Sequence, residues 1–311
     1  MIKIVSRVGN KFRELENIED DCWVHLGDPN EKEIERVSTV TGIDSDILRA
    51  PLDEEESARL DYEDGVNIVI VDIPHIVPTN DGFSYETIPL GIFMTERHFV
   101  TVCVDEDSLV EDFWAGKVKD LDTSKKTRFL LQILYKKDLR YLSYLRMIDN
   151  ASNQLENVLH KSMKNRELIQ MLRLNKSLVY FSTSLKGNEV VLEKIMRSNN
   201  IIKYEEDSEL LEDVITENKQ AIEMCGIYMD ILTGTMDAFA SLVSNNQNTI
   251  MKFFAAATIL MEIPAIISGI WGMNFTSTPL MSTVGGFYII VGISALIVFI
   301  VGFIFWKKDM F

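Results

Sequence analysis

Cysteine and histidine are scarce in this sequence, and the motifs of common enzyme classes are missing. The 311 residues include three cysteines and four histidines. Neither set has the short, paired spacing of a disulfide framework or a zinc site, and scattered cysteines are typical of a reducing cytoplasm. The sequence also lacks a P-loop, an HExxH motif and a GxSxG motif. These absences favour a protein that is not an enzyme.

Basic charge is the second deficit. Lys and Arg number 31 against 47 Asp and Glu, so the formal net charge is −16. Because no basic surface is expected from this balance, we expect no nucleic-acid partner. The charge is also unevenly distributed, since residues 1–247 carry nearly all of it and residues 250–306 almost none. We expect no secretory signal, because residues 1–10 lack an apolar core.

Two apolar windows near the C-terminus have the length of membrane spans. Ile250–Ile270 contains Lys252 near its start and Glu262 inside, whereas Gly286–Trp306 carries no charge. About 20 apolar residues cross a bilayer core, and one internal carboxylate costs only about 2.5–3.5 kcal/mol on insertion scales. We therefore predict transmembrane helices over 250–271 and 286–306. The alternative is a buried hairpin of a soluble protein.

The lysines that flank these windows predict the orientation. The connecting segment 272–285 has no Lys or Arg, whereas Lys252, Lys307 and Lys308 flank the other ends. Excess basic residues mark the cytoplasmic side. We therefore expect both termini in the cytoplasm of a cell or inner membrane, with an external loop over 272–285 and a cytoplasmic tail over 307–311.

Residues 1–122 have the pattern of a cytoplasmic α+β head, with a mixed sheet and helices. The runs Val66–Ile76 and His98–Val104 are rich in β-branched residues and have strand length. Residues 1–10 also have a strand pattern. A helical pattern follows the start signal at Asp28-Pro29.

The pattern changes to long helices from about residue 123. Residues 123–206 predict antiparallel helices: one over 124–163, a second over 165–185 ending near Gly187, and a further piece over 189–197. Because proline is absent from residue 207 until Pro264, we predict one continuous helix over Asp207–Ile270, roughly 95 Å long. Its cytoplasmic part, 207–249, forms a stalk. A helix of this length needs partner helices, from its own chain or from other copies.

One face of this long helix is polar or small at helical spacing. Two spans cannot enclose a polar path, so transport would require several subunits around an axis. Polar groups on one stripe of an apolar helix indicate a water-facing surface. Packing between helices through small residues is the alternative. The stripe consists of Asp237, Ser241, Ser244, Asn248, Met251, Ala255, Thr258 and Glu262.

Gly272-Met273-Asn274, directly after the first of two C-terminal spans, resembles the signature of the CorA family of divalent-cation channels. The segment Asp213–Phe254 is similar to the family's pore helix, and the head is similar as well. The resemblance implies a funnel-shaped homopentamer in the lipid bilayer. It also implies that Mg²⁺, and often Co²⁺ or Ni²⁺, is transported, and that Mg²⁺ has a regulatory role.

The resemblance assigns the selectivity filter to Gly272, Met273 and Asn274. Mg²⁺ releases its waters reluctantly, so neutral amide acceptors suit the hydrated ion better than a trapping carboxylate. The resemblance also places Phe254 at the hydrophobic gate, together with Met251. The residues that follow the motif, 276–280, lack the acidic groups common in the family.

Two acidic features of the sequence each have two alternative interpretations. The resemblance places a regulatory divalent site at Asp213 against a carboxylate of the neighbouring head; its partner position falls at Ala50, so nearby acids are expected to substitute. They are Asp53, Glu54, Glu55 and Glu56. A solvated acidic face is the alternative. Glu262 is expected to face the pore, because a lipid-facing carboxylate is costly, with a subunit interface as the alternative.

Two other functions compete with Mg²⁺ transport. One is a Zn²⁺, Co²⁺ or Ni²⁺ transporter of the ZntB-like branch, proton-coupled through Glu262. The other is a membrane-anchored scaffold or sensor, whose spans only tether the head.

Overall fold

The computed structural model describes residues 1–8, 11–79, 82–105, 108–114, 118, 121–161, 165–198, 201–202, 204–273 and 285–308. The chain divides into two compact units, Met1–Thr235 and Met236–Phe311. The division falls inside the longest helix, and each unit is described by itself.

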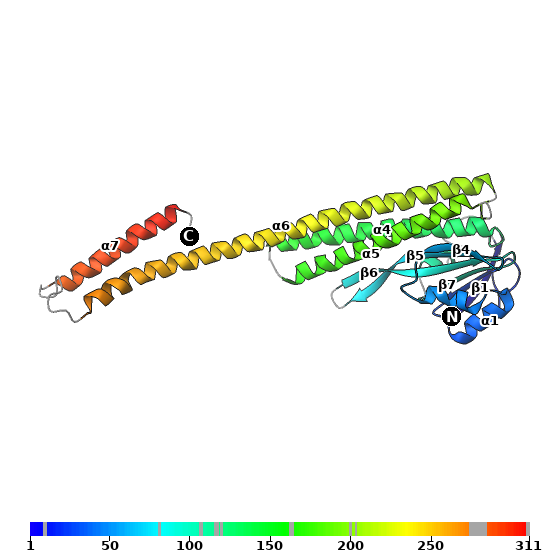
Figure 1. Cartoon of the computed structure of the whole chain (residues 1–311), viewed down its shortest axis with the longest axis horizontal. Helices are drawn as coiled ribbons and strands as arrows, with labels where there is room; N and C mark the ends of the chain where they lie inside the picture. The colour runs from blue at the N-terminus through cyan, green and yellow to red at the C-terminus, as the bar shows by residue number, and fades with distance from the viewer. Residues whose placement is uncertain are drawn as a thin grey trace. The chain divides into compact units, whose positions relative to one another are not determined.

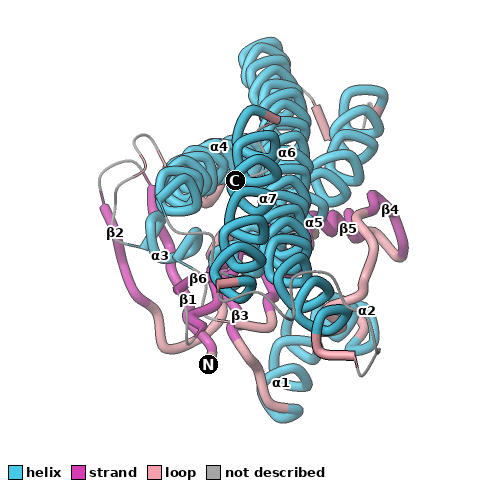
Figure 2. Tube along the Cα trace, turned by 90° about the vertical axis from the view of Figure 1, so that its left-hand side faces the viewer, coloured by secondary structure: helices cyan, strands magenta, loops and turns pink. Residues whose placement is uncertain are grey.

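The first unit contains a seven-stranded sheet in the order β2-β1-β3-β7-β6-β5-β4. Strands β3 and β7 are parallel, and the other neighbours are antiparallel. Figure 2 shows β2 and β4 at opposite margins of the sheet. The predicted mixed sheet is therefore confirmed. The strand bounds are β1 Ile2–Val8, β2 Lys11–Glu14, β3 Trp23–Gly27, β4 Arg59–Glu63, β5 Val66–Thr79, β6 Gly82–Met94 and β7 Phe99–Cys103.

The centre of the sheet is covered on both faces. Every residue of β3 and β7 is buried. Trp23 belongs to the hydrophobic core on one face, which contains the rings of Phe99 and Phe129. Val24 belongs to the core on the other face. A central parallel pair buried on both sides is continuously apolar rather than alternating, which explains why the β7 run was recognisable in the sequence.

The helices of the first unit cover the two faces unequally. The core on one side is closed by α1 and α2, and the core on the other by α3, α4, α5 and the beginning of α6. Figure 1 shows α4 and α5 lying alongside the sheet. Helix α1 starts after the N-cap Asn30, whose side chain forms a capping box with Glu33. The bounds are α1 Glu31–Thr41, α2 Ser45–Arg49, the 3₁₀ turn η1 Ala50–Leu52, α3 Ser108–Trp114, α4 Lys126–Lys161 and α5 Asn165–Arg197.

The predicted break in α5 near Gly187 is wrong, because the helix continues to Arg197. Strand β4 pairs with β5 only as far as Ile70, so the backbone of Asp72 lies beyond its end. The Asn188 side chain donates to the Asp72 carbonyl (2.8 Å) and accepts from the Asp72 N–H (2.9 Å). These two bonds satisfy an otherwise open strand edge. They also hold α5 in register against β5, which offsets the weak helix propensity of glycine.

Helix α6 spans Glu205–Trp271, and α7 spans Gly286–Lys307. The predicted single helix over Asp207–Ile270 is therefore confirmed, and it continues through Pro264. Residues from Met236 onward in α6, together with α7, belong to the second unit.

Candidate ion-conducting helix and its mouth

Helices α6 and α7 each contain a stretch long and apolar enough to cross a membrane. Their large apolar side chains are mostly exposed in the single chain; Tyr288 is 79% and Phe299 73% exposed. A soluble protein rarely exposes apolar surface on this scale. The second unit is therefore suited to a lipid environment, as the apolar windows predicted.

Helix α7 lies against one face of α6. Ala256 of α6 and Ser294 of α7 are buried. A Cβ placed on Gly302 would lie 4.0 Å from Cδ2 of Leu260. Near the end of α6, the rings of Trp271 and Phe287 are 6.3 Å apart between centroids. Ala256, Leu260 and Trp271 recur at helical spacing, so they define a single stripe that packs on α7.

The polar stripe of α6 lies on a different face. At about 100° per residue, the stripe through Ser244, Asn248, Ala255 and Glu262 is centred about 140° away from the stripe that packs on α7. All of its members from Asp237 to Glu262 are exposed in the single chain. Packing on α7 therefore leaves this stripe uncovered.

The N-terminal half of the stripe borders a shallow, open hollow. Ala240, Ser241, Ser244, Asn245 and Asn248 line it. The Ser241 hydroxyl donates to the Asp237 carbonyl at 3.0 Å. Farther along, the Thr258 hydroxyl donates to the Phe254 carbonyl at 2.8 Å. Both hydroxyl oxygens keep lone pairs that can accept from water.

The hydrophobic residues assigned to the gate occupy different positions around the helix. Met251 lies within the stripe, but Phe254 lies outside it, about 95° from the stripe's centre. Phe254 is exposed and stacks edge-on against Phe253, with ring centroids 5.9 Å apart.

Gly272 closes the end of α6 through close backbone approach. Its N–H donates to the Ser268 carbonyl at 2.9 Å, and the Met273 N–H donates to the Ile270 carbonyl at 3.3 Å. A Cβ on Gly272 would lie 3.1 Å from the Ser268 oxygen, tighter than ordinary packing. Glycine is therefore favoured here by the space at the helix end. Asn274 and residues 276–280 lie outside the described residues.

The acidic residues assigned to a regulatory site are exposed or paired locally. Asp213 is exposed on α6. Asp53 accepts from the Glu55 N–H at 3.0 Å, and Glu56 forms an ion pair with Arg59. Glu54 is exposed. Within the described residues of one chain, no group of three or more His, Cys, Asp or Glu side chains could hold a metal ion.

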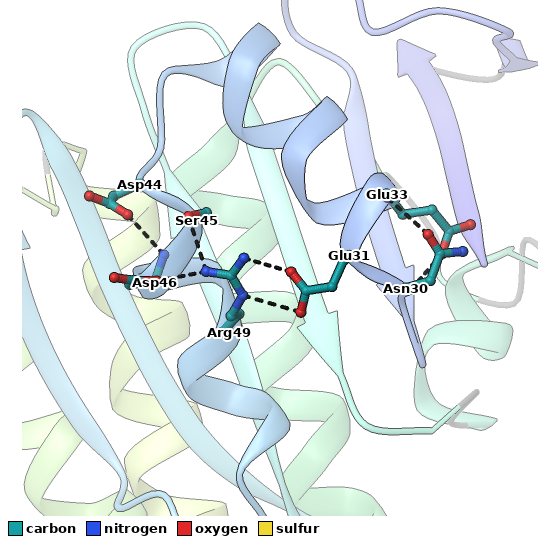
Figure 3. A network of polar contacts seen from close by, with 7 residues as sticks. All are labelled: Asn30, Glu31, Glu33, Asp44, Ser45, Asp46 and Arg49. Carbon is teal, nitrogen blue, oxygen red and sulfur yellow. Dashed lines mark hydrogen bonds and ion pairs between the residues drawn. The ribbon is translucent and has the colours of Figure 1, made fainter.

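Two other acidic residues of the first unit, Glu31 and Asp46, form ion pairs with Arg49. Its guanidinium contacts Glu31 and Asp46, each at 2.6 Å, and it lies between them in Figure 3. The hydrogen bond from Arg49 lowers the pKa of Glu31. Arg49 precedes Ala50, the position where the family resemblance expected a carboxylate. The pair with Arg49 makes Glu31 and Asp46 poorer candidates for a cation than Asp53, Glu54 and Glu55.

A buried polar layer of the first unit was missed by the sequence reasoning. Lys137 and Asp138 of α4 are fully buried, and the Lys137 Nζ lies 2.6 Å from Asp138 Oδ1. It also lies 3.4 Å from Oδ1 of Asn218 on α6, whose amide nitrogen donates to the Leu185 carbonyl of α5 at 3.2 Å. Burial raises the pKa of Asp138 to about 6. The only sequence signal was a pair of charges next to one another inside an amphipathic helix.

Comparison with known proteins decides the family. A family model for the CorA-like Mg²⁺ transporter protein matches residues 19–308. The chain belongs to the CorA-like Mg²⁺ transporter family. It is therefore related to transporters rather than to an enzyme class.

Relatives of this family match along nearly the whole chain. A cobalt/magnesium transport protein CorA from Methanocaldococcus jannaschii is 30% identical over 297 residues, covering 92% of this chain and 90% of the relative. The complete structure of the CorA magnesium transporter from the same organism superposes with a TM-score of 0.86 at 26% identity, covering 99% of this chain and 98% of that one. The structure of its soluble domain superposes with a TM-score of 0.69 at 25% identity, covering 78% of this chain and 97% of that one.

Proposed function

We propose that this protein carries Mg²⁺, with Co²⁺ as a second cargo, across the cell or inner membrane through a homopentameric pore lined by α6. The observation that supports this most directly is the polar stripe of α6, which the packing of α7 leaves uncovered. In a membrane, exposed polar side chains require water or protein partners. Several copies of α6 around an axis would turn their stripes toward one water-filled path.

The mouth of this path is assigned to Gly272, Met273 and Asn274. Five Asn274 carbonyls would accept hydrogen bonds from the water shell of the ion, which Mg²⁺ keeps because dehydration is costly. Neutral acceptors bind weakly enough for the ion to leave. The tight helix end at Gly272 would hold the ring in place. Met251 and Phe254 are proposed to form the hydrophobic constriction deeper in the path.

The orientation follows from the lysines at the ends of the two spans. Lys252 and Lys307 lie at the ends of the two apolar segments that the positive-inside tendency would place in the cytoplasm. The first unit would then be cytoplasmic, and the segment that joins the spans external. Divalent cations entering at the mouth would leave among the heads.

Divalent ions inside the cell are proposed to close the channel by binding between neighbouring heads. Asp213 of one head would face Asp53, Glu54 or Glu55 of the next. Carboxylate oxygens suit Mg²⁺, and bound cations would offset repulsion among strongly acidic heads. Mg²⁺ should protect the heads from limited proteolysis, and Asp213→Ala should weaken this protection. Unchanged protection of Asp213→Ala would contradict the site.

The function is tested by divalent uptake into sealed liposomes containing the purified protein. Wild type should accumulate Mg²⁺ and Co²⁺, and Asn274→Ala should lose uptake by at least about 100-fold, because the entry site for the hydrated ion is removed. Size-exclusion chromatography should show the same assembly for both proteins. Thr276→Ala, in the same segment, is the matched control and should transport normally.

Other outcomes of this experiment separate the alternatives. Uptake of Zn²⁺ in preference to Mg²⁺, driven by a proton gradient, would support the ZntB-like function. Absence of uptake of Mg²⁺, Co²⁺, Ni²⁺ and Zn²⁺ by wild type would contradict transport and leave a membrane-anchored scaffold.

A further inference from the structure

Glu262 is a carboxylate in the middle of an otherwise apolar helix segment. It lies ten residues after Lys252 and nine before Trp271, the last residue of α6. At 1.5 Å per residue, each end is therefore about 14–15 Å away along the helix. Ionisable groups at this depth are costly unless they meet water or an opposite charge.

No basic side chain of its own segment can neutralise Glu262. Residues three and four positions away on a helix are the ones within reach, and here they are Thr258, Ile259, Ala265 and Ile266. The basic residues between positions 236 and 308 all lie at the ends of the two apolar segments, 250–271 and 286–306: Lys252, Lys307 and Lys308. Among the described residues, the side chain of Glu262 has no hydrogen bond or ion pair.

The packing of α7 also leaves Glu262 uncovered. The side chain is exposed, and it lies across the helix from Leu260 and Trp271, the residues that meet α7. It continues the stripe of Asn248, Ala255 and Thr258 toward the mouth. The site therefore opens on the same side of α6 as the proposed ion path.

In a symmetric ring of identical chains, symmetry determines which groups can neutralise the Glu262 carboxylate. Each further copy of the chain in a symmetric ring contributes another Glu262 at the same level and no lysine or arginine. Carboxylates brought together repel one another, and the repulsion is relieved by a cation or by protonation. Oxygen ligands of this kind suit hard divalent cations.

We propose that Glu262 forms a divalent-cation site inside the membrane and sets the affinity with which the transport path holds its ion. This inference rests on the proposed pore and adds to it a second binding level, below the mouth. The ion is held there by negative charge, in contrast to the neutral amides assigned to the mouth. A negative ring in mid-span would favour divalent over monovalent cations and would slow the release of the ion.

The test compares half-saturating Mg²⁺ concentrations for uptake into liposomes. Glu262→Gln should raise this concentration by about tenfold, because the amide keeps the shape but removes the charge that binds the cation. Glu262→Asp keeps the charge and should stay within about twofold of wild type. The matched control is Met261→Gln, which places the same amide on the adjacent residue, 77% exposed and about 100° around the helix. It should leave the half-saturating concentration unchanged.

A second measurement tests whether the position meets water. Cys22, Cys103 and Cys225 are buried, so a new thiol can be followed against an unreactive background. Glu262→Cys should react with a positively charged, water-soluble thiol reagent and be protected by Mg²⁺. Met261→Cys should remain unmodified.

The outcomes separate this inference from the proposed function. Wild-type uptake with an equal half-saturating concentration in Glu262→Gln, or an unreactive Glu262→Cys, would overturn the inference and leave the transport function standing. A shift of the same size in Met261→Gln would also overturn it, because the effect would then come from polarity alone. Absence of uptake by wild type would overturn both.

Discussion

The two units of this chain treat their apolar surface in opposite ways. In residues 1–235, the largest rings are inside: Trp23 is 1% and Phe129 0% exposed. In residues 236–311, Phe299 and Tyr288 are mostly exposed. The first unit therefore completes its hydrophobic core within one chain. The second leaves its apolar faces exposed, as suits a lipid environment.

The same contrast holds for buried or membrane-embedded charge. Lys137 and Asp138 are paired within the first unit, and Asn218 adds a polar contact from another helix. The side chain of Glu262 in the second unit has no ion-pair or hydrogen-bond partner among the described residues. A buried charge that is paired within its own chain, such as Lys137, contributes to the fold. A charge in an apolar segment that has no such pair, such as Glu262, is a candidate for a functional site.

Separating the units should give the largest effect. A fragment ending at Thr235 should be soluble and should unfold cooperatively in urea, because its core lies inside one chain. A fragment starting at Met236 should precipitate without detergent, because its apolar faces remain exposed. Sedimentation and circular dichroism in buffer and in detergent measure both. A fragment of residues 1–235 that stays unfolded in buffer would contradict the contrast.

Removing one member of the buried charge pair should give the next largest effect. Lys137→Met should lower the free energy of unfolding of the first unit by about 3–5 kcal/mol, because Asp138 is left buried without its partner. Lys136→Met, a partly exposed neighbour, is the control and should change it by less than about 0.5 kcal/mol. The double variant Lys137→Met/Asp138→Leu should recover most of the loss. Urea titration of the 1–235 fragment gives all three values.

The pH dependence of the pair should give a smaller effect. Folding raises the pKa of Asp138 from 3.8 to about 6, so the folded state favours the protonated carboxyl. The stability contributed by this group is fully present below about pH 4 and is lost as the pH rises through 6, by at most about 3 kcal/mol.

The measurement is the difference in unfolding free energy between wild type and Asp138→Asn at pH 4, 5, 6 and 7. Wild type should lose stability relative to the variant over this range. Asp149→Asn, on the same helix, controls for a general carboxylate effect. A difference that is flat between pH 4 and 7 would show that folding leaves the titration of Asp138 unchanged.

Long-period features of the fold were predictable from the sequence. Helix α6 was recognisable because no proline interrupts it for almost sixty residues, and the two spans because charge is excluded from them. Strands β5 and β7 were recognisable as runs of β-branched residues. Strands β2 and β3 and the short helices α2 and α3 were not identified, because four to seven residues carry too weak a pattern. The 13-residue strand β6 was also not identified, because Pro89 and Gly91 interrupt its apolar run.

The errors and omissions share a physical cause. The sequence predicts a helix end near Gly187 because local propensity disfavours glycine, but Asn188 binds the open edge of β5, a contact that no local pattern contains. Lys137 and Asp138 were not singled out in the sequence, because their burial depends on the packing of α5 and α6 around α4. In both cases, residues far apart in sequence changed the environment of a local motif.

The sequence by itself determined which segments are apolar enough for a membrane, where charge is concentrated and which family signature follows the first span. These properties depend only on composition and spacing, which the chain carries whether folded or not. Only the tertiary structure decided which face of α6 meets α7 and which face remains open at Glu262, because that choice depends on side-chain packing between helices. It also decided that Lys137 and Asp138 are buried, since burial is a property of everything packed around a residue.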